Sequence, residues 1–304
     1  MLNKSNILAL VGGGKTPQFS KNKIIILDDH QGKIIRQIRF NSNVLKVKIR
    51  PDSIIGIVEN KIYIIHIDTL ETIDILDTSN NPHNIFSISN SIINELIIAF
   101  PHPKNKGKVQ IENYNFFNLK EDYKKDETKI ISAHESNIAY LVLNNEGTIL
   151  ATASDKGTLF RLFNVSTGEM ITELRRGAKN AKINCLAFNS TSELFGCTSD
   201  IGTVHIFDIH DVNKILEIEE NKKNNNNDNN KKEKSKKYAN IKINERSFAK
   251  YKLGEEKGIL GFTPKNELIV MTPQAKIYNT LYDVKNWEKN KSQIESSFIK
   301  VSNE

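Results

Sequence analysis

The sequence Ser-Asp-Lys-Gly-Thr at residues 154–158 determines the expected fold of this 304-residue chain, because it recurs as Ser-Asp-Ile-Gly-Thr at residues 199–203. The two copies are 45 residues apart, and the same offset pairs Ile138 with Ile183. A period of about 40–45 residues is typical of one four-stranded blade of a β-propeller. The chain is therefore predicted to be all-β and built from a repeated sheet.

The repeat extends beyond these two copies. Gly32 and Gly168 each lie in a turn between two strand-like runs and are 136 residues apart, which is about three periods. Short β-branched runs bounded by Asn, Asp, Gly or Pro are typical of buried strands. Such signals predict about six blades, and they are centred near Ile24, Ile62, Val109, Leu159, Val204 and Ile277.

Hydropathy restricts the class of protein further. No run approaches the roughly 18–20 consecutive apolar residues of a membrane span, and the N-terminus lacks the layout of a signal peptide. No transmembrane segment is expected, and any membrane contact should be peripheral. No long amphipathic helix is expected either, so residues 1–304 are treated as a single β-propeller domain.

The net charge of +7 is concentrated in one segment. The low-complexity run at residues 221–237 holds seven lysines against Asp228 and Glu233, and the rest of the chain is close to neutral. No motif with interleaved aromatic and basic residues is present, so no nucleic-acid binding is expected.

This run is interpreted as part of a long Asn/Lys-rich loop, residues 211–245, inserted in one blade. Phe188 has its counterpart in Phe262, 74 residues later, which is 29 more than one period of 45. A segment this polar cannot bury enough apolar surface to fold alone. Two interpretations stay open: an inert solvated loop, or a loop that approaches an anionic surface, where each lysine contributes roughly 1 kcal/mol.

The two cysteines, Cys185 and Cys197, lie in strand-like segments without CxxC spacing or a clustered histidine. Neither a metal site nor a disulfide framework is expected. Buried, reduced thiols are predicted, as in a reducing compartment.

A glycine-rich segment, Gly-Gly-Gly-Lys-Thr at residues 12–16, ends like a phosphate-binding P-loop. That motif needs glycine at the position held by Ala9 and a helix after the lysine, whereas a strand is expected here. No nucleophile, metal cluster or acid/base pair emerges elsewhere, so the chain is not expected to be an enzyme and no cofactor is implied.

Two adjacent arginines, Arg175 and Arg176, lie between the two copies of the repeat. Successive side chains of an extended segment point to opposite faces, so the two arginines cannot serve the same pocket. The planar guanidinium group is suited to bidentate contacts with phosphate. The pair therefore predicts two neighbouring anion sites.

Several segments together resemble the PROPPINs, the WD-repeat proteins that bind phosphoinositides, also known as WIPI proteins. The resemblance rests on Leu-Arg-Arg-Gly at 174–177 and on the stretches 6–14, 22–29, 132–136, 151–158 and 202–207. It implies a seven-bladed WD40-type β-propeller, of which about six blades are evident here and the N-terminal blade is missing or incomplete. It places the long loop in the sixth blade.

The resemblance also implies two phosphoinositide pockets on the rim. The first pocket would comprise Arg175, His134, Ser136, Lys156 and Thr158, and the second would comprise Arg176, Ser199, Thr203 and His205. A structural alternative stays open for the threonines, which could close turns, and for His205, which alternates with two apolar residues.

Two departures from the family pattern carry expectations of their own. Ile201 takes the place that Lys156 holds in the first copy, so the second pocket is expected to be the weaker one. The run at 221–237 has no apolar anchor, so electrostatic adhesion is expected instead of insertion, with binding that falls as salt is added.

The function implied by the resemblance is binding of phosphatidylinositol 3-phosphate and 3,5-bisphosphate during autophagosome formation or related trafficking. The expected location is cytoplasmic, with peripheral attachment to preautophagosomal, endosomal or vacuolar membranes. A large autophagy lipid-transfer protein is the expected partner. The alternative is a WD-repeat scaffold that binds acidic or phosphorylated peptides without lipid.

Overall fold

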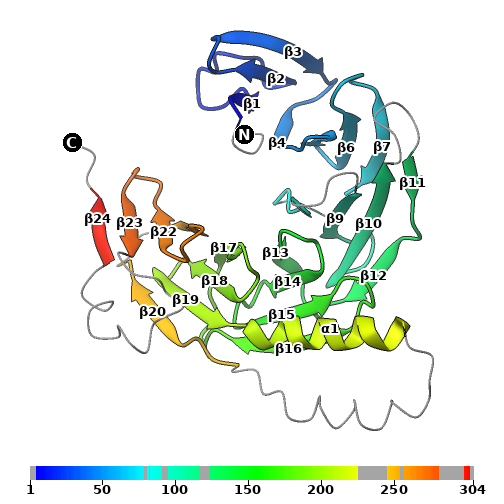
Figure 1. Ribbon diagram of the computed structural model, residues 1–304. Coiled ribbons are helices and arrows are strands. Elements are labelled where there is room, and N and C mark those ends of the chain that lie inside the picture. The colour runs from blue at the N-terminus through cyan, green and yellow to red at the C-terminus, as the bar shows by residue number, and fades with distance from the viewer. Residues whose placement is uncertain are drawn as a thin grey trace.

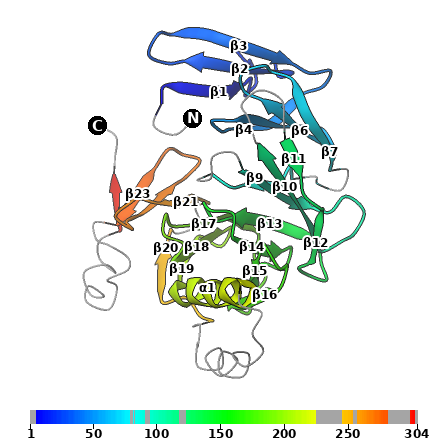
Figure 2. The ribbon, with the colours of Figure 1, turned by 45° about the vertical axis from the view of Figure 1, so that its right-hand side comes forward.

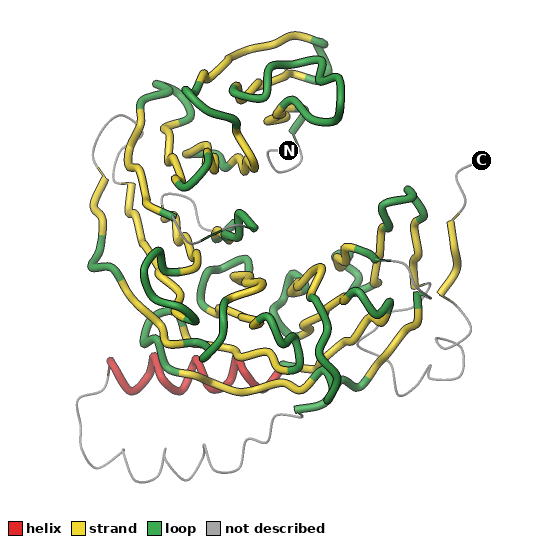
Figure 3. Tube along the Cα trace, turned by 180° about the vertical axis from the view of Figure 1, so that it is seen from behind, coloured by secondary structure: helices red, strands yellow, loops and turns green. Residues whose placement is uncertain are grey.

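Consecutive antiparallel sheets follow one another around an arc in the computed structural model, which describes residues 5–78, 81, 83–90, 95–116, 123–224, 245–253, 257–280 and 298–301 (Figure 1). The chain forms each sheet before it enters the next, as a propeller repeat requires. In the described residues the arc is open between the β1–β3 sheet and the β21–β24 sheet, which Figure 3 shows from behind.

The first half of the arc contains three sheets. Their strands are β1 (Ile7–Val11), β2 (Lys23–Asp28) and β3 (Lys33–Arg39); β4 (Val44–Ile49), β5 (Ser53–Val58), β6 (Lys61–His66) and β7 (Thr72–Asp77); and β8 (Ser87–Ile88), β9 (Glu95–Pro101), β10 (Lys108–Phe116), β11 (Tyr123–Lys125) and β12 (Lys129–Ser132). Both β11 and β12 pair with β10.

The second half contains three four-stranded sheets in chain order. Their strands are β13 (Ile138–Leu143), β14 (Ile149–Ser154), β15 (Leu159–Asn164) and β16 (Met170–Arg175); β17 (Ile183–Phe188), β18 (Leu194–Ser199), β19 (Thr203–Asp208) and β20 (Ala249–Lys252); and β21 (Ile259–Phe262), β22 (Leu268–Met271), β23 (Ile277–Thr280) and β24 (Phe298–Val301).

The predicted repeat is confirmed. Each of the six strand signals falls in a different sheet, in β2, β6, β10, β15, β19 and β23. The repeat also extends to local irregularities, because the innermost strands β4, β13 and β17 each shift register against the next strand after their first residue. Irregularities of this kind bend and twist a strand. The first sheet has three strands in the described residues.

Apolar layers between neighbouring sheets hold the arc together. The layer between the β13–β16 and β17–β20 sheets includes Phe160, Phe195 and Phe207, which are fully buried. Their ring centroids lie 5.5–6.0 Å apart in edge-on or tilted pairs. Truncating one such ring typically costs about 3–5 kcal/mol. This layer fixes the two sheets that carry the repeated Ser-Asp-x-Gly-Thr turns.

The glycine of each repeated turn is required by its backbone conformation. Gly157 and Gly202 have φ angles of 58° and 66°, in the left-handed region that favours glycine. A Cβ atom on Gly157 would also lie 1.9 Å from the carbonyl oxygen of Ala181. The turn between β14 and β15 therefore packs directly against the segment that leads into β17.

One helix was missed in the sequence. The segment after β19, expected to begin a loop, forms α1 (His210–Asn224), which lies across the β13–β16 and β17–β20 sheets (Figure 2). Val212 and Ile215 are buried, and Leu216 packs against the same apolar layer, so the apolar residues follow a helical spacing. The rest of the expected loop, from residue 225 to residue 244, lies outside the described residues.

The cysteine prediction is confirmed, because Cys185 and Cys197 are buried free thiols. Burial raises the pKa of both thiols. Among the helices the structure describes, none is long and apolar enough to cross a membrane.

Candidate functional site

The two arginines at the end of β16 lie in different environments. The register of β15 and β16 places Leu159 opposite Arg175 and Phe160 opposite Leu174. Leu174 is fully buried in the apolar layer toward β17–β20, so Arg175 belongs to the other face of its sheet. Arg175 is exposed, whereas Arg176 is only 5% exposed.

Arg176 is fixed by backbone carbonyl groups. Its Nε donates to the carbonyl oxygen of Gly157 at 2.5 Å, and its terminal nitrogen donates to the carbonyl oxygen of Lys179. Burial lowers the pKa of the guanidinium from its ordinary value, while Cys197 and Asp200 act in the opposite direction. These two residues come from β18 and from the turn after it, so the charge of Arg176 acts toward the β17–β20 sheet.

The other three residues predicted for the second pocket lie on β18 and β19. Ser199 is fully buried, and its hydroxyl oxygen has no hydrogen-bond partner among the described residues. His205 lies opposite Cys197 and Lys250, and its Nδ1 is 3.1 Å from the hydroxyl oxygen of Ser247. Thr203 is half-buried at the start of β19.

His205 is held in its neutral form. Burial, together with the charges of Lys250 and Arg176, lowers its pKa to about 4. An anion beside the imidazole would favour the charged form. The cluster thus combines two cations, a neutral imidazole and an unpaired hydroxyl group, and within the described residues neither cation forms an ion pair, although the charge of Asp200 acts on Arg176.

An arginine that was not predicted from the sequence lies beside His134, a residue of the first predicted pocket. His134 Nε2 lies 2.9 Å from Thr152 Oγ1, and Thr152 Oγ1 donates to the carbonyl oxygen of Arg161. Arg161 donates to the carbonyl oxygen of Ala133 at 2.7 Å and forms an ion pair with Glu173 at 2.9 Å. Burial and the charge of Arg161 lower the pKa of His134 to about 4.

Arg161 could have been found from strand alternation. It lies opposite Glu173, and Glu173 is two residues before Arg175, so all three share one face of the sheet. The face is shared with His134, which arrives from the segment after β12.

The other predicted members of the first pocket surround the same end of the sheet without joining Arg175. Lys156 is exposed in the turn between β14 and β15, and Thr158 and Ser136 are half-buried. The carbonyl oxygen of Thr158 accepts from the backbone N–H of Arg176 at 2.9 Å. Within the described residues, no hydrogen bond joins the guanidinium of Arg175 to these side chains or to His134.

The segment that returns to β20 passes beside Arg175. The backbone N–H of Arg175 donates to the carbonyl oxygen of Glu245 at 2.6 Å, and Arg175 forms a parallel bridge with Arg246. No sequence pattern predicted this neighbour, because Arg246 follows the long insertion. A further arginine therefore lies at the boundary between the two predicted pockets.

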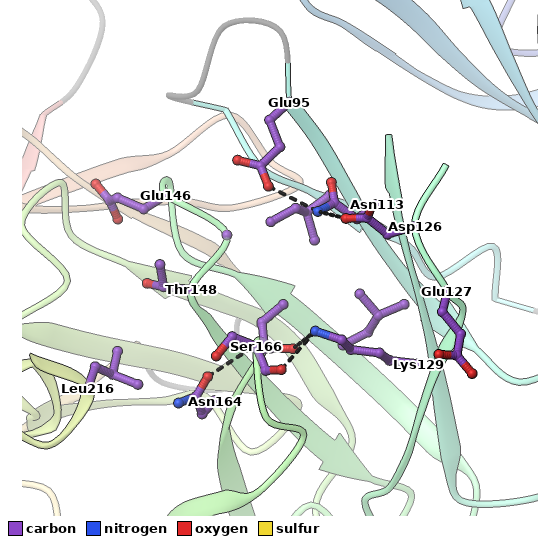
Figure 4. Close-up of a pocket in the computed structure, with 14 residues that line it drawn as sticks. Glu95, Asn113, Asp126, Glu127, Lys129, Glu146, Thr148, Asn164, Ser166 and Leu216 are labelled. Carbon is purple, nitrogen blue, oxygen red and sulfur yellow. Dashed lines mark hydrogen bonds between the residues drawn. The ribbon is translucent and has the colours of Figure 1, made fainter. Parts of the chain in front are cut away.

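A cavity at the opposite ends of the strands has the wrong charge for phosphate. It has a volume of about 190 Å³ and lies between the β8–β12 and β13–β16 sheets, with Leu216 of α1 in its wall (Figure 4). Its acidic lining residues are Glu95, Asp126, Glu127 and Glu146. The one lysine in the lining, Lys129, is bound to the carbonyl oxygens of Val165 and Ser166.

The described residues contain no candidate metal site. Within them, no group of three or more His, Cys, Asp or Glu side chains could hold a metal ion. The candidate site is therefore defined by its arginines, neutral histidines and hydroxyl groups.

The repeated four-stranded sheets and the two-sided arginine pair define a β-propeller with candidate anion sites on its rim. A sequence model of the PROPPIN family matches residues 5–224, and the chain belongs to this family of autophagy-related β-propellers.

Sequence relatives agree with this assignment. The chain is 30% identical over 275 residues to autophagy-related protein 18e of Arabidopsis thaliana, covering 89% of this chain and 68% of the relative. It is 35% identical over 233 residues to SVP1-like protein 2 of Saccharomyces cerevisiae, covering 70% of this chain and 52% of the relative. The chain thus spans about half to two thirds of these relatives.

Solved structures are similar in fold. Hsv2 of Kluyveromyces lactis matches with a TM-score of 0.67 and 18% identity, covering 93% of this chain and 80% of the neighbour. A complex of KlAtg21 with the coiled-coil of AgAtg16 matches with a TM-score of 0.68 and 18% identity, covering 92% and 78%.

Proposed function

We propose that this chain binds membranes that carry phosphatidylinositol 3-phosphate or 3,5-bisphosphate, through two rim pockets divided by Arg175 and Arg176. The observation that carries the proposal is the placement of these adjacent arginines on opposite sides of one sheet, each side with its own neutral histidine. Membership of the PROPPIN family supports the ligand class.

The first pocket uses Arg175 with His134, Ser136, Lys156 and Thr158. The backbone carbonyl of Arg161 orients His134 through Thr152, and the guanidinium of Arg161, which is paired with Glu173, adds a third positive charge. A charge-assisted hydrogen bond to phosphate contributes about 1.5–3 kcal/mol. The exposed Arg175 and Lys156 can reorient toward a headgroup without breaking a described ion pair.

The second pocket uses Arg176 with Ser199, Thr203 and His205. The buried hydroxyl group of Ser199 supplies a donor for a phosphate oxygen. Ile201 is 50% exposed in the turn where the first copy has the exposed Lys156, so the second pocket lacks that cation. We therefore rank it as the weaker of the two pockets.

The cellular role follows from two weak sites on one rigid body. Engaging two headgroups together raises avidity by a factor on the order of 10²–10⁴ over a single site. The protein would act without catalysis, as a cytoplasmic scaffold recruited to preautophagosomal, endosomal or vacuolar membranes during autophagosome formation. Its proposed partner there is a large autophagy lipid-transfer protein.

A second candidate function is a scaffold whose arginines bind acidic or phosphorylated peptides. One structural neighbour is solved as a complex with a coiled-coil, so a related propeller surface does take a protein. In the first function Arg175 and Arg176 bind lipid headgroups, and in the second they bind a protein. Vesicle flotation distinguishes the two functions.

The test compares flotation on phosphatidylcholine vesicles with and without 3-phosphoinositide. Wild type is expected to float only with the phosphoinositide vesicles, and R175T/R176T is expected to remain unbound. The matched control is R36T/R39T, which removes two exposed arginines from β3. No enrichment of the wild type on phosphoinositide vesicles would favour the peptide scaffold.

Ser199→Ala tests the second pocket with little risk to the fold, because it removes a hydroxyl group that has no described partner. Its binding to phosphoinositide vesicles should fall several-fold while its thermal stability is retained. Unchanged vesicle binding would exclude Ser199 from the pocket.

A further inference from the structure

A basic cavity lies against the inner strands of the arc. It has a volume of about 660 Å³ and is walled by β4, β13, β17 and the segments that lead into β8 and β17. Its basic lining residues include three lysines, Lys46, Lys48 and Lys182. Asp155 is the one carboxylate among the described residues of this lining.

Lys46 and Lys48 are directed to the same place. They are two residues apart on β4, so their side chains leave the same face of the strand. Their ammonium groups lie 5.2 and 5.7 Å from the centroid of one ring, that of the buried Phe86. Two like charges are therefore held close to one aromatic ring, an arrangement that a shared anion would stabilise.

The three lysines of the cavity are not paired with a carboxylate in the part of the chain that the structure describes. Two other basic side chains that lie beside buried strands are paired, Arg50 with Asp52 and Lys125 with Asp74 and Glu112. No ion pair within the described part of the chain includes Lys46, Lys48 or Lys182.

The pKa of Lys48 is lowered by its surroundings in the cavity wall. Burial and the neighbouring charge of Lys46 lower the pKa of Lys48 to about 8. Lys46 is more exposed than Lys48, and partial desolvation lowers its pKa as well. The other titratable groups in the cavity wall are His83, Tyr140, Asp155 and Lys182, and the Cys185 thiol lies near Lys46.

We propose that this cavity binds a small phosphorylated anion, with Lys46 and Lys48 as its principal ligands and Lys182 as a third cation. The site is separate from the rim pockets, because β4 and β13 are the innermost strands of their sheets, whereas Arg175 ends β16, the outermost strand. A soluble ligand can enter a cavity on the inner strands without the protein lying on a bilayer. The soluble form of the anion is therefore the expected ligand.

Calorimetric titration with inorganic pyrophosphate at near-physiological salt tests the proposal. Wild type is expected to bind one pyrophosphate, and K46Q and K48Q are each expected to weaken binding about tenfold. The control K21Q/K265Q removes two exposed lysines outside the cavity and should bind like wild type. Absence of binding to the wild type, or equal binding by K46Q/K48Q, would overturn the proposal.

Lys48→Arg provides a second test, in which the variant keeps the positive charge at residue 48 and the pH dependence of pyrophosphate affinity is measured. Wild-type affinity should fall as the pH rises from 7 to 9, because Lys48 loses its proton in this range. Arginine stays charged there, so K48R should keep its affinity. A parallel decline in both proteins would remove Lys48 from the site.

Vesicle flotation separates a soluble anion from a lipid headgroup. K46Q/K48Q should float on 3-phosphoinositide vesicles like wild type, and R175T/R176T should lose flotation while still binding pyrophosphate. If K46Q/K48Q lost flotation instead, the cavity would belong to headgroup binding and the soluble-ligand proposal would be wrong. Failure of the rim proposal would leave the pyrophosphate result unchanged.

Discussion

Arg176 Nε donates to the carbonyl oxygen of Gly157 at 2.5 Å, and this bond connects the segment after β16 to the turn between β14 and β15. The second of the two arginines is thus a structural residue as well as a candidate ligand. Arg175 has no such role for its side chain in the described residues, because its described bond to Glu245 uses the backbone.

This difference predicts unequal stability of the two single variants. R176T should lower the free energy of unfolding by about 2–4 kcal/mol, because the buried guanidinium loses two charge-assisted bonds to backbone carbonyl groups. R175T should change it by less than about 0.5 kcal/mol, as is usual for an exposed side chain. Urea denaturation measures both values. Equal stability of the two variants would contradict the described role of Arg176.

The repeated glycine gives a second prediction. G157A should destabilise the protein by more than about 2 kcal/mol, because it combines a positive φ angle with a close approach to Ala181. Gly177 is the matched control, since a Cβ atom there meets nothing within 4 Å and its φ is not positive. Equal melting temperatures of G157A and G177A would contradict the requirement for glycine at residue 157.

The helix offers a third prediction. V212A should cost about 1.5–2.5 kcal/mol, because Val212 is fully buried in the layer that joins two sheets. E217A, on the exposed side of α1, should have almost no effect. Thermal unfolding of both variants checks whether α1 is an integral part of the propeller. Equal melting temperatures of V212A and the wild type would mean that α1 does not stabilise the propeller.

The sequence predicted the period, the strands and the two-sided arginine pair, because these depend on local spacing. The turns at Gly157 and Gly202 recur because each needs a residue in the left-handed region, and the repeated glycine can be recognised in the sequence alone. Arg161 was missed because its role arises from pairing across strands with Glu173 and from contact with Ala133. The helix was missed because Val212 and Ile215 precede a low-complexity run whose composition dominated the interpretation.

The two histidines predict a pH dependence of stability. The native pKa of His134 and of His205 is about 4, below the ordinary value of 6.5. Between these values the unfolded chain binds more protons than the native chain, so the free energy of unfolding decreases as the pH falls through this window. H134Q and H205Q should each reduce the decrease seen between pH 6.5 and pH 4.5 in urea titrations. An unchanged slope in both variants would show that the imidazoles titrate normally.

Binding of a phosphorylated headgroup should raise the pKa of His134 and His205, whereas folding lowers it. A phosphate beside His134 or His205 raises the pKa of the imidazole, so binding takes up protons and strengthens as the pH falls. Flotation on 3-phosphoinositide vesicles should therefore increase several-fold from pH 7.5 to pH 5.5 for the wild type, and much less for H134Q/H205Q. Because phosphate monoesters themselves lose charge near pH 6, the comparison between the two proteins carries the test. Equal pH profiles would place both histidines away from the bound headgroups.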